Sequence, residues 1–219
     1  MGKDKKRPYF QLIKSFPLAA KPVMLSFFMF LLIPTHPLKE GSSHWIEASQ
    51  SGRRKEDFEL LRIYSVLKSR MELKDATIWK IAETILEESL QHSLDPMLVL
   101  AIITIESRFQ HKAVSAEGAR GLMQINPQIA DSLAKEAEIA LWSGEKSLDD
   151  PVLNIKLGVF YLGHLKKTFR DLKLALTAYN WGPTEVKNRL AEERTVPQDY
   201  AAKVLSAYRS LRRTDRQTH

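Results

Sequence analysis

The segment Met97–Ile105 limits the fold of this chain more than any other part of its sequence. Read as a helix, its nine residues present apolar side chains on every side, and such a helix must be buried on every side. It is far shorter than the roughly 20 residues that a membrane-spanning helix needs. Asp95 and Pro96 mark its start, because aspartate caps a first turn and proline at the first helical position loses no hydrogen bond. The segment therefore predicts a helix through the centre of a packed domain.

Helical spacing continues on both sides of this segment. Apolar residues recur every three or four positions between Phe58 and Leu67, and again between Tyr200 and Leu211. Asn126–Pro127 and Asp150–Pro151 repeat the cap-plus-proline signal, so each predicts another helix start. The chain lacks the sustained two-residue alternation that a large sheet would require. The sequence therefore predicts a mostly α-helical fold, with a last helix near residues 199–212.

Composition divides the chain into four parts. A basic leader and an apolar segment occupy residues 1–34, and a linker with an N-terminal helix is expected over residues 35–73. Within that part, residues 35–55 contain Pro, Gly and Ser, which are typical of linkers. We expect the main helical domain over residues 74–213 and a polar tail over residues 214–219.

Charge and cysteine content exclude several classes of function. The chain has a net charge of +7, of which residues 1–40 carry +5 and the remainder only +2. Because the body of the protein is nearly neutral, the excess indicates membrane topology rather than a nucleic-acid partner. Cysteine is absent, which excludes a disulfide, a thiolate nucleophile and a thiolate metal site.

The leader indicates export. Thirteen uncharged residues from Pro22 to Pro34 follow the basic stretch, a length that fits the apolar core of a signal peptide better than a membrane span. Gly41–Ser43 is the nearest approach to a small-residue cleavage site. The alternative is an uncleaved inner-membrane anchor over residues 16–34, with Lys21 reaching the interface. We expect a protein of the periplasm or cell envelope that contacts the membrane through this segment.

Glu106 follows the central apolar segment directly. Val99, Ile103 and Glu106 have the spacing of one helix face, so the carboxylate continues an apolar row at the C-terminal end of the helix. Burial and the negative end of the helix dipole both raise the pKa of such a carboxyl group. A raised pKa is what a general acid for glycosidic cleavage requires. The alternative is a surface glutamate, or one paired with Arg108 or Arg120.

Two further motifs carry polar groups suited to sugars. Gly118 and Gly121 allow a tight loop whose backbone can approach a ligand closely. After the second glycine, Gln124 stands between the apolar residues Met123 and Ile125. The segment Ala178–Pro183 offers a phenol, an amide and an indole together at a helix end. Aromatic rings with polar tips are suited to binding sugar rings and their substituents. Each motif alone is more often a turn or a satisfied polar group.

In their order and spacing, these motifs resemble the soluble lytic transglycosylase (SLT) domain family. The resemblance rests on Glu106-Ser107 at a helix end, on Gly121–Gln124 fifteen residues later, and on Ala178–Asn180 with glycine at 182. Further matches are Leu148–Pro151, Asn154-Ile155, Gly158 and Tyr161-Leu162. The resemblance covers roughly residues 75–210 and implies a lysozyme-like, mostly α-helical fold. The site would lie in a groove beside the central helix.

The resemblance also implies roles for individual residues. Glu106 corresponds to the family's single catalytic acid and base, and Ser107 to a structural neighbour. Trp181 departs from the family, many of whose members have a small residue there, and would add a stacking surface. No metal or organic cofactor is implied. Substrate contacts are implied for Ser115, Met123, Gln124, Tyr179, Asn180 and Trp181.

The implied enzyme is a peptidoglycan lytic transglycosylase that cleaves the β-1,4 bond between N-acetylmuramic acid and N-acetylglucosamine. Glu106 would protonate the bridging oxygen and then deprotonate the muramoyl 6-hydroxyl, which closes a 1,6-anhydro ring. A second carboxylate, as ordinary glycosidases use, is not implied. Sequence candidates for one are Glu117, Asp131, Asp149 and Asp150.

Two alternatives stay open at this point. One is a goose-type-like lysozyme, in which water replaces the 6-hydroxyl. The other is a noncatalytic wall-binding component of an envelope-spanning secretion or pilus machine. Such a machine is also the candidate partner of an active enzyme, beside the peptidoglycan strands themselves.

Overall fold

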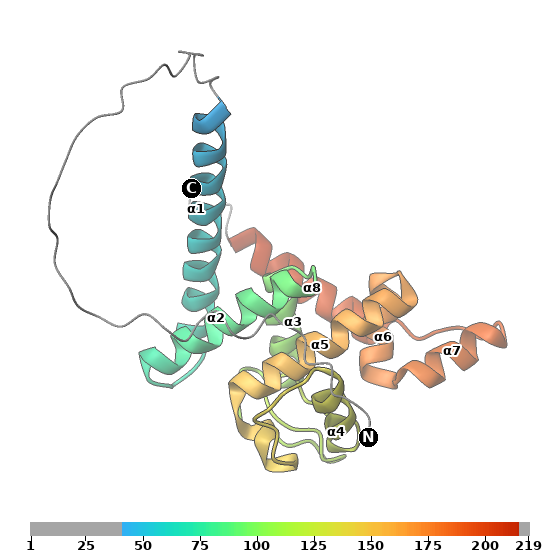
Figure 1. Cartoon of the computed structure of the whole chain (residues 1–219). Coiled ribbons are helices and arrows are strands. Elements are labelled where there is room, and N and C mark those ends of the chain that lie inside the picture. Colours follow the sequence, from blue (N-terminus) through green and yellow to red (C-terminus); the bar gives the residue numbers. More distant parts are fainter. Residues whose placement is uncertain (1–40, 215–219) are drawn as a thin grey trace, which may run out of the picture. The chain divides into compact units, whose positions relative to one another are not determined.

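The computed structural model describes the backbone of residues 41–214, in which every regular element is helical (Figure 1). The leader that the sequence assigns to a signal or anchor lies outside the described residues. Between residues 41 and 214, no helix is both long enough and apolar enough to cross a membrane. The elements are α1 (Gly41–Lys68), α2 (Asp75–Gln91), α3 (Pro96–Glu106), α4 (Pro127–Glu136), the 3-10 helix η1 (Glu145–Asp149), α5 (Pro151–Phe169), α6 (Leu172–Trp181), α7 (Pro183–Ala191) and α8 (Asp199–Thr214).

The three predicted cap-plus-proline helix starts are confirmed. α3, α4 and α5 each begin at the proline, and the preceding side chain accepts hydrogen bonds from the first turn. Asp95 accepts from the backbone N–H of Met97 at 2.8 Å, and Asn126 caps α4 in the same way. These caps fix where the helices around the candidate site begin.

The N-terminal helix is longer than the sequence analysis expected. α1 begins at Gly41, so the expected linker is wrong for residues 41–55. The physical reason is that glycine and serine reduce helix stability by at most about 1 kcal/mol each, whereas no proline lies between Pro37 and Pro96 to break a helix. The division between this helix and the main domain at residue 74 stays a prediction.

α3 is the central helix, as its sequence predicted. Every residue from Pro96 to Ile103 is buried, and Leu100, Ile102 and Ile103 are completely inaccessible to solvent. α2 and α8 pack directly against α3. Burial on all sides is what an all-apolar helix requires, so the buried helix and the mostly α-helical fold class are both confirmed.

α8 runs antiparallel to α3 and is tied to both of its ends. At the start of α3, the Tyr208 hydroxyl and the Arg212 guanidinium donate hydrogen bonds to Asp95 Oδ2, at 2.6 and 2.5 Å. At the other end of α3, Tyr200 of α8 lies against Glu106. Pairing at two points along the same two helices fixes the register of α8, and thereby places Tyr200 next to the glutamate.

Candidate active site

Glu106 is the last residue of α3 and is only half-buried, whereas the helix is fully buried from Pro96 to Ile103. The Tyr200 hydroxyl donates a hydrogen bond to Glu106 Oε1 at 2.5 Å. Burial raises the pKa of the Glu106 carboxyl above its usual range, and the hydrogen bond from Tyr200 opposes this in part. The result is a carboxyl group that holds its proton more readily than a surface glutamate, beside a donor that stabilises its anion.

The alternative of an ion-paired glutamate is not supported. Arg120 donates to both carboxylate oxygens of Asp149, at 3.1 and 2.9 Å, and pairs with Glu145 at 3.0 Å. Arg108 is exposed. Within the described residues, Glu106 forms no ion pair with an arginine or lysine. The carboxyl group is therefore free to exchange its proton with a ligand.

The loop between α3 and α4 is folded onto α5 through one buried amide. Asn154 is completely buried; its Oδ1 accepts from the N–H of Met123 at 2.7 Å and its Nδ2 donates to the carbonyls of Arg120 and Leu148. Gly121 lies against this amide with a φ of +80°, and a Cβ there would come within 2.2 Å of Asn154 Nδ2. Glycine is therefore needed at this position both for its conformation and for its lack of a side chain.

The same loop orients two predicted site residues, Gln124 and Ser115. The Gln124 amide nitrogen donates to the carbonyls of Ala113 and Gly121, at 3.1 and 3.0 Å, which leaves its oxygen available to accept from a ligand. Gln124 itself has a φ of +48°. The Ser115 hydroxyl donates to Glu117 and accepts from two backbone N–H groups of its own turn. Both side chains thus stabilise the loop that carries them.

A pocket of about 430 Å³ brings most of the predicted site together. Its wall combines residues from the end of α3, the following loop, α4, α5 and α6. Five of the seven predicted site residues line it: Glu106, Ser115, Gln124, Tyr179 and Asn180. Residues more than 70 positions apart in the sequence thus meet around the glutamate, in a cavity that also has apolar walls from Ile125 and Ile129.

Tyr179 and Asn180 have different surroundings in this pocket. The Tyr179 hydroxyl donates to the carbonyl of Met123 at 2.8 Å, and its ring lies 5.3 Å from that of Tyr161. Burial, followed by the nearby charge of Glu106, raises the pKa of Tyr179 well above its usual range, so the hydroxyl stays protonated. Asn180 is exposed, and no hydrogen bond joins its amide to the described residues. Tyr179 therefore forms a fixed part of the pocket wall, whereas the Asn180 amide is available to a ligand.

The other two predicted site residues do not line the pocket. The Met123 side chain is completely buried in the core, where it packs against Gly158 of α5. Its backbone contributes instead, by accepting from Tyr179. Trp181 is 45% exposed at the end of α6, with Arg189 lying over its ring. It is next in sequence to Asn180 but outside the cavity wall.

Tyr200 is the site residue that sequence reasoning missed. It belongs to the apolar stripe of the last helix, and periodicity alone predicts only that its ring faces the core. Burial raises the pKa of Tyr200 well above its usual range, and the Glu106 charge adds to this, so the hydroxyl remains a donor. The available signal was its hydroxyl, because a buried tyrosine usually finds a hydrogen-bond partner; the identity of that partner required the tertiary structure.

The other acidic residues near the site have structural partners. Asp149 pairs with Arg120, Asp150 caps α5, and Asp131 accepts from the Trp142 indole at 2.6 Å. Glu117, which accepts from Ser115, is the one sequence candidate for a second carboxylate that lines the pocket. Among the residues that the structure describes, no group of three or more His, Cys, Asp or Glu side chains is arranged to hold a metal ion.

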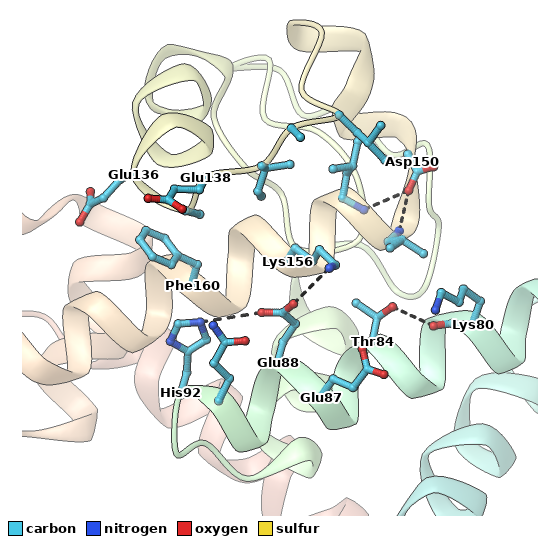
Figure 2. Close-up of a pocket in the computed structure, with 17 residues that line it drawn as sticks. Lys80, Thr84, Glu87, Glu88, His92, Glu136, Glu138, Asp150, Lys156 and Phe160 are labelled. Atoms are coloured by element: carbon cyan, nitrogen blue, oxygen red, sulfur yellow. Dashed lines mark hydrogen bonds and ion pairs between the residues drawn. The ribbon is translucent and has the colours of Figure 1, made fainter. Parts of the chain in front are cut away.

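A larger cavity of about 770 Å³ lies elsewhere and has different chemistry (Figure 2). It is formed by α2, the segment after α4 and a different face of α5. Glu88 lies between Lys156 and His92, at 3.5 and 3.8 Å, so its carboxylate is already paired within the cavity. Burial lowers the pKa of His92 despite the neighbouring Glu88. Size alone would favour this cavity as a binding site, but the residues that resemble a glycan-cleaving site surround the smaller one.

Comparison with known proteins matches much of the helical domain to one family. Residues 83–201 match the family described as "Transglycosylase SLT domain". The chain is 35% identical over 115 residues to the transglycosylase of Enterobacteria phage PRD1, and 37% identical over 92 residues to the soluble lytic murein transglycosylase of Escherichia coli K12. These matches include 52% and 42% of this chain, but only 39% and 14% of the phage and bacterial proteins.

The fold has a solved counterpart as well. The crystal structure of the 70 kDa soluble lytic transglycosylase of E. coli superimposes with a TM-score of 0.54 at 28% sequence identity. The matched part is 60% of this chain and 24% of that protein. A family match over more than half of the chain, with the same helical fold, leads to one conclusion: this protein is a member of the SLT-domain transglycosylase family.

Proposed function

We propose that this protein is a peptidoglycan lytic transglycosylase that uses Glu106 as its single acid and base. The observation that carries the proposal is the position of Glu106. It is a half-buried carboxyl group with a raised pKa, placed in a pocket with Gln124, Tyr179 and Asn180. Membership of the SLT-domain family supplies the substrate class. The bond cleaved would be the β-1,4 bond between N-acetylmuramic acid and N-acetylglucosamine.

The two opposing influences on Glu106 suit a residue that acts twice. Burial favours the protonated form, which must donate to the glycosidic oxygen as the bond breaks. The Tyr200 hydroxyl then stabilises the carboxylate that remains. The substrate's 2-acetamido group would stabilise the anomeric carbon in place of an enzyme nucleophile. The Glu106 carboxylate would take the proton of the muramoyl 6-hydroxyl as that oxygen attacks, which restores the acid without consuming water.

The remaining pocket residues would bind and orient the sugars. The Gln124 amide oxygen and the Asn180 amide are available for the acetamido and hydroxyl groups of the glycan. The Tyr179 ring would supply a fixed wall for a sugar ring, because its hydroxyl is held by Met123. Ser115 would act mainly by shaping the loop that carries it.

The products of digestion distinguish this function from its nearest rival. Purified sacculi digested by residues 44–219 should give muropeptides that end in 1,6-anhydromuramic acid, because the 6-hydroxyl is the attacking group. A goose-type-like lysozyme would give reducing ends instead, each heavier by one water molecule. Mass spectrometry of the released fragments separates the two. A protein that binds sacculi and releases no fragments would support the noncatalytic wall-binding alternative and overturn the proposal.

Tyr200→Phe is expected to move the alkaline limb of the pH profile of kcat/KM to higher pH. Glu106 must be protonated to act as the acid, so activity falls as the pH rises through its pKa. The Tyr200 hydrogen bond lowers that pKa, and its removal therefore raises it. Tyr208→Phe is the matched control, because it removes a hydroxyl from the other end of α8, at Asp95. If the alkaline limb shifts equally in both variants, the shift comes from a general destabilisation of α8 and not from the loss of the Tyr200–Glu106 hydrogen bond.

The proposal also includes export to the cell envelope and a candidate partner. Peptidoglycan lies in the cell envelope, and the basic and apolar leader of the sequence suits delivery there. An envelope-spanning secretion or pilus machine is the candidate partner, since such a machine requires a local opening in the wall. Membrane contact through residues 16–34 belongs to the same proposal.

A further inference from the structure

Trp181 is a large aromatic side chain held on the surface beside the candidate pocket. It ends α6 and follows Asn180, which lines the pocket, yet 45% of its surface is exposed to solvent. α6 and α7 adjoin one another (Figure 1). The turn between them consists of Gly182, with a φ of +86°, and Pro183, which begins α7. This sharp turn brings α7 back toward the indole ring.

Arg189 of α7 lies over that ring. Its guanidinium carbon lies 5.0 Å from the centre of the Trp181 ring. The guanidinium is itself held in two places: Nε donates to Glu185 at 2.7 Å, and Nη1 donates to the carbonyl of Thr195 at 3.1 Å. Glu185 also balances the positive charge of Arg189. The guanidinium is therefore suited to bracing the Trp181 ring rather than to binding an anion.

A braced ring with an exposed side is a preorganised platform. Isolated exposed aromatic residues are common and need no explanation, but most are free to change rotamer. Here Arg189 covers part of the ring and limits its movement, so a ligand that stacks on the exposed part would lose little side-chain entropy. Aromatic faces suit ligands with one flat apolar face and polar edges, and a pyranose ring has that character.

We infer that Trp181, braced by Arg189, forms a stacking subsite for a sugar ring of the glycan strand that lies outside the Glu106 pocket. This inference rests on the proposed function. The proposed function places the sugars at the cleaved bond in the pocket of about 430 Å³, and the Trp181 ring would bind a sugar farther along the strand. The subsite therefore makes cleavage depend on strand length.

The test compares kcat/KM on long peptide-free glycan strands with kcat/KM on a strand of two disaccharide units. Trp181→Ala should lower the long-to-short ratio roughly three- to tenfold, mainly through KM, whereas Trp181→Phe should keep most of it. Arg189→Met should give a smaller fall, because the ring stays but loses its brace. Trp79→Ala is the matched control: this tryptophan is also exposed, but lies on α2 and is hydrogen-bonded to Glu83.

The outcomes separate the subsite from the function on which it rests. If the unchanged protein cleaves neither substrate, the proposed function fails. If it cleaves both and Trp181→Ala leaves the ratio as it was, only the subsite is overturned. An equal loss on both substrates overturns it too, because a general structural defect does not depend on strand length. Dissociation constants of long and short strands in the Glu106→Gln background give the same comparison without turnover.

Discussion

Replacement of Glu106 by glutamine is expected to lower glycan cleavage by at least about 10³-fold, a loss that general acid–base catalysis supports. Glutamine has nearly the same shape and can still meet the Tyr200 hydroxyl, but it can neither donate a proton to the glycosidic oxygen nor accept one from the 6-hydroxyl. Since one carboxylate is proposed for both steps, both are lost together. The measurement is the rate of release of soluble fragments from purified sacculi.

Glu117→Gln is the control that tests the single-carboxylate mechanism. Glu117 lines the same pocket and is exposed, with Ser115 as its partner. An ordinary two-carboxylate glycosidase would need such a residue, and would lose most of its activity in this variant. The proposed mechanism predicts that the Glu117 variant retains activity far above that of Glu106→Gln. Equal losses in the two variants would contradict it.

The Glu106→Gln variant should be more stable than the unchanged protein at neutral pH. Burial raises the folded-state pKa of Glu106 above its unfolded value. The stability that its protonated form contributes is therefore fully present below the unfolded pKa of about 4.3 and is lost as the pH rises through the folded pKa. Glutamine has no such loss. Thermal unfolding at several pH values should show a gain in Tm at neutral pH that disappears near pH 4, and a variant less stable at neutral pH would argue against a raised pKa.

Gly121→Ala is expected to destabilise the protein by about 3 kcal/mol, from the left-handed backbone and the overpacking together. The Cβ would come within 2.2 Å of Asn154 Nδ2 and 2.5 Å of the Leu148 carbonyl oxygen. Neither can move freely, because the Asn154 amide makes three hydrogen bonds, two to the loop and one to the Leu148 carbonyl itself. The loop would shift instead, and with it Gln124. We expect activity to fall by about 10²-fold, the cost of a misplacement of about 1 Å.

Gly118→Ala separates the two causes of this loss. Gly118 lies in the same loop with a φ of +82°, but a Cβ there meets no atom within 4 Å. It should cost only the conformational part, about 1 kcal/mol. Urea denaturation followed by circular dichroism measures both variants on the same scale. If both variants lose the same unfolding free energy, the contact with Asn154 is relieved without cost. Gly121 would then be required only for its backbone conformation.

Much of the helical framework could be predicted because its signals are local. A cap followed by proline acts within one turn, so the starts of α3, α4 and α5 followed from Asp95, Asn126 and Asp150. The extension of α1 to Gly41 was not foreseen. Polar composition weakens a helix without forbidding it, and only proline gives a firm local stop.

The sequence by itself determined that Glu106 ends a buried central helix, since a helix that is apolar on every side can lie only inside a protein. Through the family resemblance, it also predicted that the loop and the Tyr-Asn pair surround Glu106. Only the tertiary structure decided which atoms meet around the carboxyl group. The Tyr200 hydroxyl, which donates to Glu106, belongs to a residue 94 positions away on another helix. Met123 contributes a backbone carbonyl that holds the Tyr179 hydroxyl, while its side chain fills the core. Periodicity shows that a side chain is buried, but the atom it faces depends on how separate helices pack.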